Sequence, residues 1–380
     1  MRIADIRAVP ISFPVPAEHS VRLGIGRSFK RDSVLVRVET DEGHVGWGEG
    51  HHGRAPGAIA KLIDTTMREL VMGMDPFDVA GVWARVFKMQ LASHGMGAAA
   101  ALALSGLDMA LWDLRSHATG WPLYRLLGGS AKPIKAYAGG IALGWQDPAS
   151  LAEEALRHLK TGYRALKLRV GDTAAKDIAR VRAVRKAVGE DIDILVDANT
   201  NYTLDDVRKV MPAFEDAGVG WLEEPFPPMD RRAYAAAAKL GRVPLAAGEN
   251  HYTRYEFATL IEDGHVGFVQ PDLSKTGGVT EAMRIAAMAS AQKLTVNPHT
   301  SATAINMATS IHYLCAVDNP GYFEGGVTTL NPFRDQMTDK APYVLDTNGR
   351  VTAHSGPGIG MKIDLKFIAE HPLIDGPCYV

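Results

Sequence analysis

Three short apolar runs, each followed by an acid, decide the fold: they lie in IDILVDA at residues 192–198, VGWLEEP at 219–225 and VPLAAGE at 243–249. The acids Asp197, Glu223 and Glu249 are evenly spaced, since 223 − 197 = 26 and 249 − 223 = 26. Helical patterns separate the runs. A strand and a helix that alternate in this way predict a parallel βα barrel, in which the side chains just past the strand ends converge on one mouth.

Three carboxylates at one mouth would repel one another unless a cation neutralised them. A ligand set made only of oxygen favours a hard ion, so the spacing predicts Mg²⁺, with water or substrate oxygens completing the octahedron. Taken singly, each acid would more often be a helix N-cap or a solvated loop charge. Their register on successive strands favours a shared metal site.

The overall composition points to a small-molecule partner. The chain has 380 residues, enough for a barrel and a second domain. Its 41 basic and 43 acidic residues give a net charge of −2. This balance provides no basic surface for nucleic acid or for an anionic membrane, so we expect neither as a partner.

Membrane insertion and secretion are not expected. The most apolar window, residues 95–107, is too short to cross a bilayer and is followed by Asp108 and Asp113. The first residues lack a long apolar signal segment, and the two cysteines, Cys315 and Cys378, do not make a disulfide framework. We therefore expect a cytoplasmic protein with two buried cysteines.

The N-terminal third has the pattern of an α+β domain. Alternating strands are predicted at 3–13, 33–40 and 44–50, and helices at 58–71, 77–91 and 98–117. The segment 18–31 is polar and contains glycine, and it predicts either a solvated surface loop or a mobile lid over a neighbouring site.

The barrel begins after the Gly and Pro linker LLGGSAKPI. We place the N-terminal domain at residues 1–132 and the barrel at 133–354, and we expect the tail, about 355–380, to return to the first domain. Seven helical stretches separate the strand candidates, which predicts a (β/α)7β barrel. The eight candidates are IKAYAG, RALKLRV, IDILVDA, VGWLEE, VPLAAGE, HVGFVQPD, KLTVNPH and GYFEGG.

The order of short motifs along the whole chain resembles the enolase superfamily, and within it the mandelate racemase subgroup. The motifs are GWGE, ALSGLDMALWDL, LLGG, KLR, VDAN, EEP, GEN, QPD with GG, NPH and a late Glu324. The resemblance implies an α/β fold: a modified TIM barrel, (β/α)7β, with an α+β capping domain formed by the N-terminal part and the C-terminal tail. It also implies Mg²⁺-assisted removal of a proton α to a carboxylate. We expect a homo-oligomer.

The resemblance also implies roles for individual residues. Asp197, Glu223 and Glu249 match the family's metal ligands. His299 and Asp272 match its His-Asp dyad, and an aspartate would fix the tautomer of a histidine base and stabilise its imidazolium. Lys167 matches the first lysine of a Lys-x-Lys pair near the substrate carboxylate, and Glu324 matches the acid that hydrogen-bonds the enediolate oxygen.

One position departs from the racemase pattern. Arg169 stands where the family has a second lysine base, and an arginine essentially never loses its proton. With a single base, dehydration of an aldonic or aldaric acid to a 2-keto-3-deoxy acid fits best. A racemase, an epimerase or a lactone cycloisomerase on the same scaffold remains the alternative, and a non-catalytic binding protein is a further one. In the muconate-lactonising subgroup a lysine of the sixth strand is a base, and Lys275 could take that place. The QPD register and the match at His299 argue against this alternative.

Candidates for substrate binding lie mostly in the capping domain. They are Arg27 in the segment 18–31, where a basic loop would hold a distal carboxylate or several hydroxyls, then His51 and His52 after GWGEG, and Asn199 after the first metal ligand. For the two histidines, an ordinary loop is an equally good interpretation.

Overall fold

The predicted barrel is confirmed, and every one of the eight strand candidates supplies a strand. The computed structural model describes residues 1–300 and 303–380. Neighbouring barrel strands follow one another in chain order, and the last one pairs with the first. Val296 bridges Pro320, which continues the ring between the seventh and eighth strands. The strands are β6 (Ile134–Gly139), β7 (Ala165–Arg169), β8 (Asp193–Asp197), β9 (Val219–Glu223), β10 (Leu245–Ala247), β11 (Phe268–Val269), β12 (Thr295–Val296) and β13 (Phe323–Gly326).

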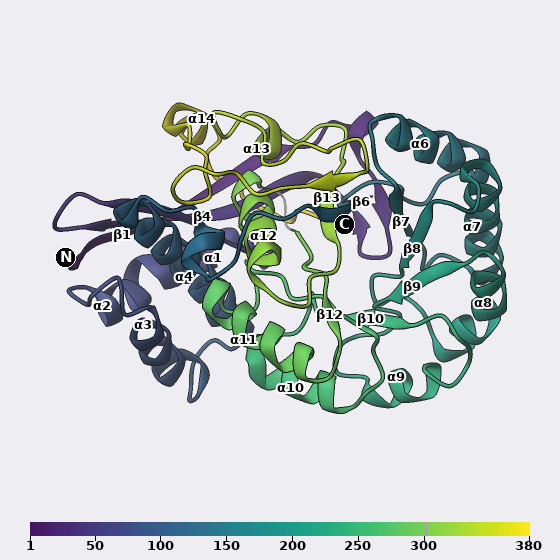
Figure 1. The fold of residues 1–380 in the computed structure, drawn as a ribbon, viewed down its shortest axis with the longest axis horizontal. Helices are drawn as coiled ribbons and strands as arrows, with labels where there is room; N and C mark the ends of the chain where they lie inside the picture. Colours follow the sequence, from purple (N-terminus) through teal and green to yellow (C-terminus); the bar gives the residue numbers. More distant parts are fainter. Residues whose placement is uncertain (301–302) are drawn as a thin grey trace.

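A helix follows each strand from β6 to β12, and Figure 1 shows these helices around the outside of the strands. The predicted helix at 204–217 illustrates why they form. It opens with a capping box between Thr203 and Asp206, and its apolar residues fall on one buried face. The helices are α6 (Pro148–Lys160), α7 (Ala174–Val188), α8 (Leu204–Asp216), α9 (Arg231–Ala237), α10 (Thr253–Glu262), α11 (Gly278–Ala291) and α12 (Ala304–Ala316).

The N-terminal body is an antiparallel sheet in the order β1-β4-β5, covered by helices. The long helix α4 lies close against β5 because both carry glycine at the contact. A Cβ on Gly48 would stand 2.2 Å from the carbonyl oxygen of Gly106. The elements are β1 (Ile3–Pro14), β4 (Lys30–Thr40), β5 (Val45–Gly50), α1 (Pro56–Lys61), the π-helix η2 (Leu62–Met67), α2 (Arg68–Val71), α3 (Val79–Val86), the π-helix η3 (Phe87–Leu91), α4 (Ala98–Thr119) and α5 (Leu123–Leu126).

The segment between β1 and β4 differs from the predicted loop 18–31. The segment contains a short hairpin. Lys30 and Arg31, the last two residues of the predicted loop, are buried members of β4. The prediction failed there because their charged side chains are held by neighbours that are distant in sequence. In Figure 1 this purple segment lies beside β6 and β7. Its elements are η1 (Ala17–His19), β2 (Arg22–Leu23) and β3 (Gly26–Arg27).

The C-terminal residues run back along the N-terminal body. The nitrogen of Ser12 donates to the carbonyl of His371, and residues 378–380 exchange hydrogen bonds with residues 27–29. The chain therefore ends beside the barrel mouth (Figure 1). The tail elements are α13 (Pro332–Asp335), β14 (Arg350–Val351), which pairs with β6, and α14 (Leu365–Glu370).

The barrel interior has an apolar half and a polar half. A buried cluster that includes Tyr137, Leu195 and Trp221 fills the half away from the C-terminal ends of the strands. Charged side chains occupy the half at the strand C-termini, which is where barrel enzymes place their sites. Among the described residues, no helix has the length and apolarity that a membrane span requires.

Candidate active site

Asp197, Glu223 and Glu249 converge at the mouth, as their spacing predicted. Asp197 ends β8 and lies directly opposite Glu223, which ends β9. Glu249 follows β10 after Gly248, whose φ of +150° and close approach to the backbone of Gln270 leave no room for a Cβ. All three carboxylates are buried.

Cationic side chains compensate these carboxylates. Lys167 Nζ lies 2.9 Å from Glu223 Oε1, 3.0 Å from Glu324 Oε1 and 3.5 Å from Asp197 Oδ2. Arg169, two residues along the same strand and therefore on the same face, donates to Asp197 through Nη1. Among the described residues, the oxygens of Asp197, Glu223 and Glu249 do not form a group within 4.8 Å of one another. Their assignment as ligands of one metal ion stays a prediction.

The protonation of this cluster follows from burial and neighbouring charges. Burial, together with the charges of Asp197 and Glu324, raises the pKa of Glu223 to about 7, although Lys167 acts in the opposite direction. Burial alone would lower the pKa of Lys167, but Glu223 and Glu324 raise it well above the ordinary lysine value. Lys167 is therefore a cation in this arrangement.

His299 and Asp272 form a hydrogen-bonded pair. His299 Nδ1 lies 2.7 Å from Asp272 Oδ2, and His299 Nε2 lies 3.0 Å from Glu249 Oε2. Burial acts against charge on both side chains, yet their mutual attraction lowers the pKa of Asp272, and Glu249 helps to raise the pKa of His299. One nitrogen of the imidazole is thus held by the aspartate, while the other faces the carboxylate cluster.

The other oxygen of Asp272 is fixed by polar neighbours. Its Oδ1 accepts hydrogen bonds from the backbone nitrogen and hydroxyl of Ser274, at 2.7 and 2.6 Å, and from the side-chain amide of Asn306 at 2.9 Å. The aspartate therefore cannot rotate away from His299 without losing three bonds.

Glu324 is a buried carboxylate that lies among hydrogen-bond donors and cations. Its Oε1 accepts from the nitrogen of Gly140 at 2.9 Å, and its Oε2 accepts from the nitrogen of Thr300 at 3.2 Å. Burial would raise its pKa, but the charges of Lys167, His299 and Arg169 lower it to about 2. In this arrangement Glu324 is a carboxylate that accepts hydrogen bonds, and its role as the acid that hydrogen-bonds the enediolate oxygen stays a prediction.

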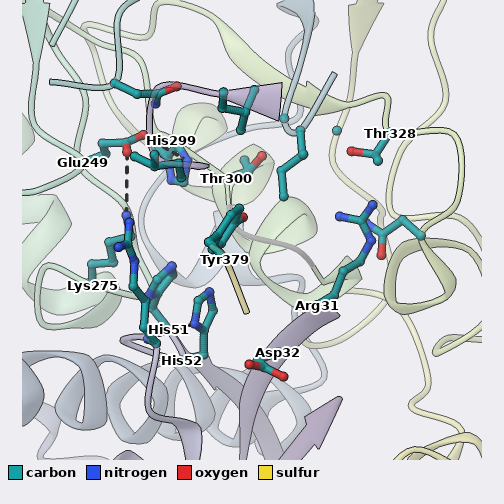
Figure 2. A pocket seen from close by; sticks show the side chains of 18 of the residues that line it. Arg31, Asp32, His51, His52, Glu249, Lys275, His299, Thr300, Thr328 and Tyr379 are labelled. Atoms are coloured by element: carbon teal, nitrogen blue, oxygen red, sulfur yellow. Dashed lines mark hydrogen bonds and ion pairs between the residues drawn. The ribbon is translucent and has the colours of Figure 1, made fainter. Parts of the chain in front are cut away.

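The capping domain supplies the wall opposite the barrel strands. Leu23, Ile25, His51 and His52 line the same pocket as Arg169, Glu249 and His299, and Figure 2 shows the two histidines below Lys275. Burial lowers the pKa of His52 to about 3, and that of His51 well below its ordinary value. Each Nδ1 accepts a backbone hydrogen bond, from Gly53 and Arg54 respectively, so each Nε2 carries the proton. They are neutral donors.

Two other predicted substrate residues have different outcomes. Asn199 lines the pocket with φ of +45°, and it bonds Asp197 through both its backbone nitrogen and its side chain. Arg27 does not line this pocket. It is exposed, and it donates to the hydroxyl of Ser20 and to the carbonyl of Ala17, so it holds its own loop together.

The pocket also contains residues that the sequence did not single out as site residues. They include Lys30, Arg31, Thr328 and Tyr379, and Lys275, which was weighed above as a base, also lines the pocket. The available signal for Lys30 and Arg31 was that two consecutive basic residues stand directly before the predicted strand 33–40. Tyr379 had no local signal, because only the return of the tail brings it there.

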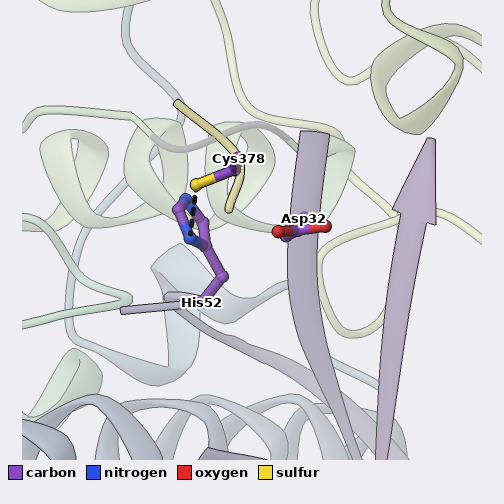
Figure 3. A group of neighbouring side chains, drawn as sticks. All are labelled: Asp32, His52 and Cys378. Atoms are coloured by element: carbon purple, nitrogen blue, oxygen red, sulfur yellow. Dashed lines mark hydrogen bonds between the residues drawn. The ribbon is translucent and has the colours of Figure 1, made fainter. Parts of the chain in front are cut away.

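A second group of polar side chains lies at the edge of the pocket. Asp32, His52 and Cys378 have donor atoms within 4.8 Å of one another, and Figure 3 shows the thiol beside the imidazole. The ammonium of Lys30 contacts both oxygens of Asp32, at 2.8 and 2.9 Å. A cation already neutralises the only charged ligand, so this group is not a convincing metal site.

Comparison with known proteins places the chain among curated enzymes. It is 32% identical over 332 residues to an arabinonate dehydratase of Saccharolobus solfataricus, covering 87% of this chain and 88% of the relative. It is 30% identical to a D-galactarolactone cycloisomerase of Agrobacterium fabrum, covering 91% and 93%.

Solved structures agree with this placement. A member of the enolase superfamily from Polaromonas sp. JS666 is 52% identical and superposes with a TM-score of 0.97 over 100% of both chains. A racemase from Streptomyces coelicolor A3(2), solved with bound magnesium, is 28% identical with a TM-score of 0.88, covering 98% of this chain and 100% of the other.

Two family descriptions match the two halves of the chain. Residues 6–128 match the mandelate racemase / muconate lactonizing enzyme N-terminal domain, and residues 150–367 match the enolase C-terminal domain-like family. The motif order that runs from GWGE to Glu324 therefore reflects common descent: the chain belongs to the enolase superfamily, in its mandelate racemase subgroup.

Proposed function

We propose that this protein is a Mg²⁺-dependent lyase that dehydrates a sugar acid, an aldonate or an aldarate, to a 2-keto-3-deoxy acid. The observation that carries the proposal is the pair formed by His299 and Asp272. It places one imidazole nitrogen 3.0 Å from Glu249, at the edge of the carboxylate cluster. Arg169, at the position of the racemase pattern's second base, cannot act as one, because an arginine essentially never loses its proton. Lys167 lies beside it as a cation among the carboxylates of Glu223 and Glu324.

The carboxylate cluster has the chemistry of a magnesium site. Asp197, Glu223 and Glu249 offer only oxygen ligands, and all three are buried. Oε2 of Glu249 makes no hydrogen bond within the described residues, although Nε2 of His299 lies 3.0 Å from it. Mg²⁺ held there would neutralise the negative charge that develops on the substrate carboxylate when the α-proton leaves. Lys167 and Arg169 would stabilise the same charge from β7.

His299 would remove the α-proton through Nε2. Asp272 keeps the proton of the neutral ring on Nδ1 and stabilises the imidazolium that forms. The departing β-hydroxyl would then take this proton from the imidazolium and leave as water. The resulting enol tautomerises to the 2-keto acid, so His299 returns to its starting state and the net change is loss of one water.

The relatives support dehydration as the main reaction and isomerisation as the alternative. One is an arabinonate dehydratase, which is a sugar-acid lyase by name. Another is a D-galactarolactone cycloisomerase, so an isomerase of a related carboxylate is the alternative. A racemase or an epimerase yields no 2-keto acid, which separates it from dehydration by product. A cycloisomerase that eliminates the ring oxygen of a lactone also yields a 2-keto acid but releases no water, so formation of the 2-keto acid from an open-chain acid separates it from dehydration.

The test is a screen of an acid-sugar library for 2-keto acid formation with Mg²⁺, followed by NMR in deuterated water. We expect dehydration of at least one member. His299→Asn should lower both turnover and α-proton exchange by about 10²–10⁴-fold, the range of a positioned general base. His94→Asn is a matched control, because His94 is exposed and its φ of +52° suits asparagine. Native exchange in His299→Asn would exclude the assignment of the base.

Two further properties belong to the same proposal. Both cysteines are free, which is consistent with a reducing compartment such as the cytoplasm. Exposed apolar side chains at Met89, Met96 and Tyr255 support a homo-oligomer, because such surface is commonly covered by another subunit. Light scattering of the purified protein tests the oligomeric state, and a monomer at micromolar concentration would exclude it.

A further inference from the structure

A buried guanidinium that has no anionic partner among the described residues forms part of the pocket wall. Arg31 is 4% exposed, and its Nε donates to the carbonyl of Leu330 at 3.0 Å. Its Nη2 is buried and has no hydrogen-bond partner among the described residues. A buried cation is costly unless it is paired, so this arrangement calls for an anion from outside the chain.

The acids near Arg31 are already paired with other cations. Asp32 accepts from Lys30 at 2.8 and 2.9 Å, and Asp335 accepts from Arg334 at 2.6 and 2.7 Å. Burial lowers the pKa of Arg31 to about 10, which still leaves it protonated at neutral pH. The chain therefore holds a charged and largely dehydrated guanidinium in place.

The position of Arg31 suits the far end of a substrate. Figure 2 shows Arg31 beside Thr328, on the side of the pocket away from Glu249 and Lys275. The pocket joins the two sides, since Arg31, Glu249 and His299 all line it. A molecule with one carboxylate at the barrel cluster would extend its other end towards Arg31.

We propose that Arg31 binds a second carboxylate of the substrate, so that the sugar acid is an aldarate, with a carboxylate at each end, rather than an aldonate. This inference rests on the proposed function for the orientation of the substrate. The planar guanidinium offers two parallel donors to a carboxylate, a geometry that a hydroxymethyl group cannot use. Thr328 and Tyr379 line the pocket as well and provide uncharged hydroxyls nearby.

Pairs of six-carbon acids test the inference by binding rather than by turnover. Each pair consists of an aldarate and the aldonate of the same configuration, in the galacto, gluco and manno series, titrated calorimetrically into His299→Asn with Mg²⁺. For the best-bound pair, we expect the aldarate to bind about 10²-fold more tightly, as for a buried charge pair. When Arg31→Met is added to His299→Asn, the preference for the aldarate over the aldonate should fall to about fivefold or less.

Matched variants separate charge recognition from misfolding. Arg31→Lys keeps the charge and should retain part of the preference. Arg37→Met removes an arginine of the same strand that pairs with Glu39 and does not line the pocket. This variant should retain the whole preference for the aldarate. The ratio between two ligands on one variant does not depend on the fraction of folded protein, which circular dichroism reports separately.

Four outcomes would overturn the inference. They are equal binding of both members of each pair, a preference that survives Arg31→Met, no binding of any aldarate, and tightest binding of an aldonate phosphorylated at C6, which would assign Arg31 to a phosphate. Failure of the proposed function looks different: an aldarate binds in an Arg31-dependent way, but the unmodified enzyme forms no 2-keto acid from any member of the library.

Discussion

The side-chain amide of Asn306 donates a 2.9 Å hydrogen bond to Oδ1 of Asp272, the residue that holds His299. The backbone nitrogen of Asn306 in turn donates to Glu49 of the capping domain at 3.1 Å. Glu49 also accepts a bond from the hydroxyl of Thr303. The GWGE motif of the cap is therefore linked to the histidine base through the first turn of α12.

This link predicts that Asn306 positions the dyad. Asn306→Ala should lower kcat about tenfold with little change in KM, as for other residues that orient a catalytic ligand. Because Asp272 would lose a donor and interact more strongly with His299, the acidic limb of the kcat/KM profile should move to higher pH. Thr309→Ala is the control, since within the described part of the chain that hydroxyl bonds its own helix, at the carbonyl of Ile305. An unchanged pH profile together with reduced kcat would indicate a merely structural role.

Magnesium dependence should distinguish Glu223 from its neighbour Glu224. EDTA should abolish activity, and Mg²⁺ should restore it. Glu223→Gln should weaken Mg²⁺ binding at least about tenfold in calorimetric titration, because a carboxylate ligand is lost. Full activity in protein that elemental analysis finds metal-free would exclude the site.

Glu224→Gln provides the matched control. Glu224 is equally buried, and burial with the charges of Glu249 and Asp197 raises its pKa well above the ordinary value. Its Oε2 already accepts from the side-chain amide of Asn250 at 2.7 Å. A neutral amide resembles the protonated acid, so the Mg²⁺ affinity of this variant should change far less than that of Glu223→Gln.

The chain terminus should control the segment over the barrel mouth. Residues Arg27 and Phe29 make three backbone hydrogen bonds with Cys378 and Val380, and each such bond contributes about 1 kcal/mol. Removing residues 378–380 should accelerate tryptic cleavage at Arg22 and Arg27 and raise KM about tenfold, since Tyr379 lines the pocket.

Substrate with Mg²⁺ should suppress cleavage of the full chain. Tyr379→Phe, which keeps the backbone bonds, should resist the protease, and equal cleavage of full-length and truncated chains would refute the idea.

A buried acid between the two domains should make stability depend on pH. Asp108 of α4 accepts from the nitrogen and hydroxyl of Thr280, at 2.8 and 2.6 Å, and burial raises its pKa to about 7. The unfolded chain loses this proton near pH 4, so between about pH 4 and 7 the native state binds more protons than the unfolded state. The free energy of unfolding therefore falls as pH rises, by up to about 1.4 kcal/mol per pH unit from this group.

Asp108→Asn removes that contribution. The amide keeps one acceptor for the nitrogen of Thr280 and offers a donor to its hydroxyl, so the fold should be retained. Denaturant titrations at pH 5 and pH 7 should give a smaller decrease in the free energy of unfolding for the variant than for the unmodified protein. Identical decreases would exclude Asp108 as the titrating group.

The sequence by itself determined the architecture. Alternation of apolar runs with helical patterns predicted all eight barrel strands, because strands buried on both faces need continuous apolar residues and their connecting helices need one apolar face. It also predicted that Asp197, Glu223 and Glu249 would gather, because the C-terminal ends of parallel strands share one edge. The family assignment, the lyase chemistry and magnesium followed from the order of the motifs.

Only the tertiary structure decided the other side of the pocket. Arg27, predicted to bind substrate, holds its own loop, while Arg31, predicted to be in that loop, lies buried in the pocket wall. Tyr379 arrives there from the far end of the chain. The physical reason is that local patterns reveal which face of a strand is buried, but the pairing of a buried charge depends on partners brought together by long-range contacts. The acids near Arg31 are paired with other cations, and this is visible only in the folded chain.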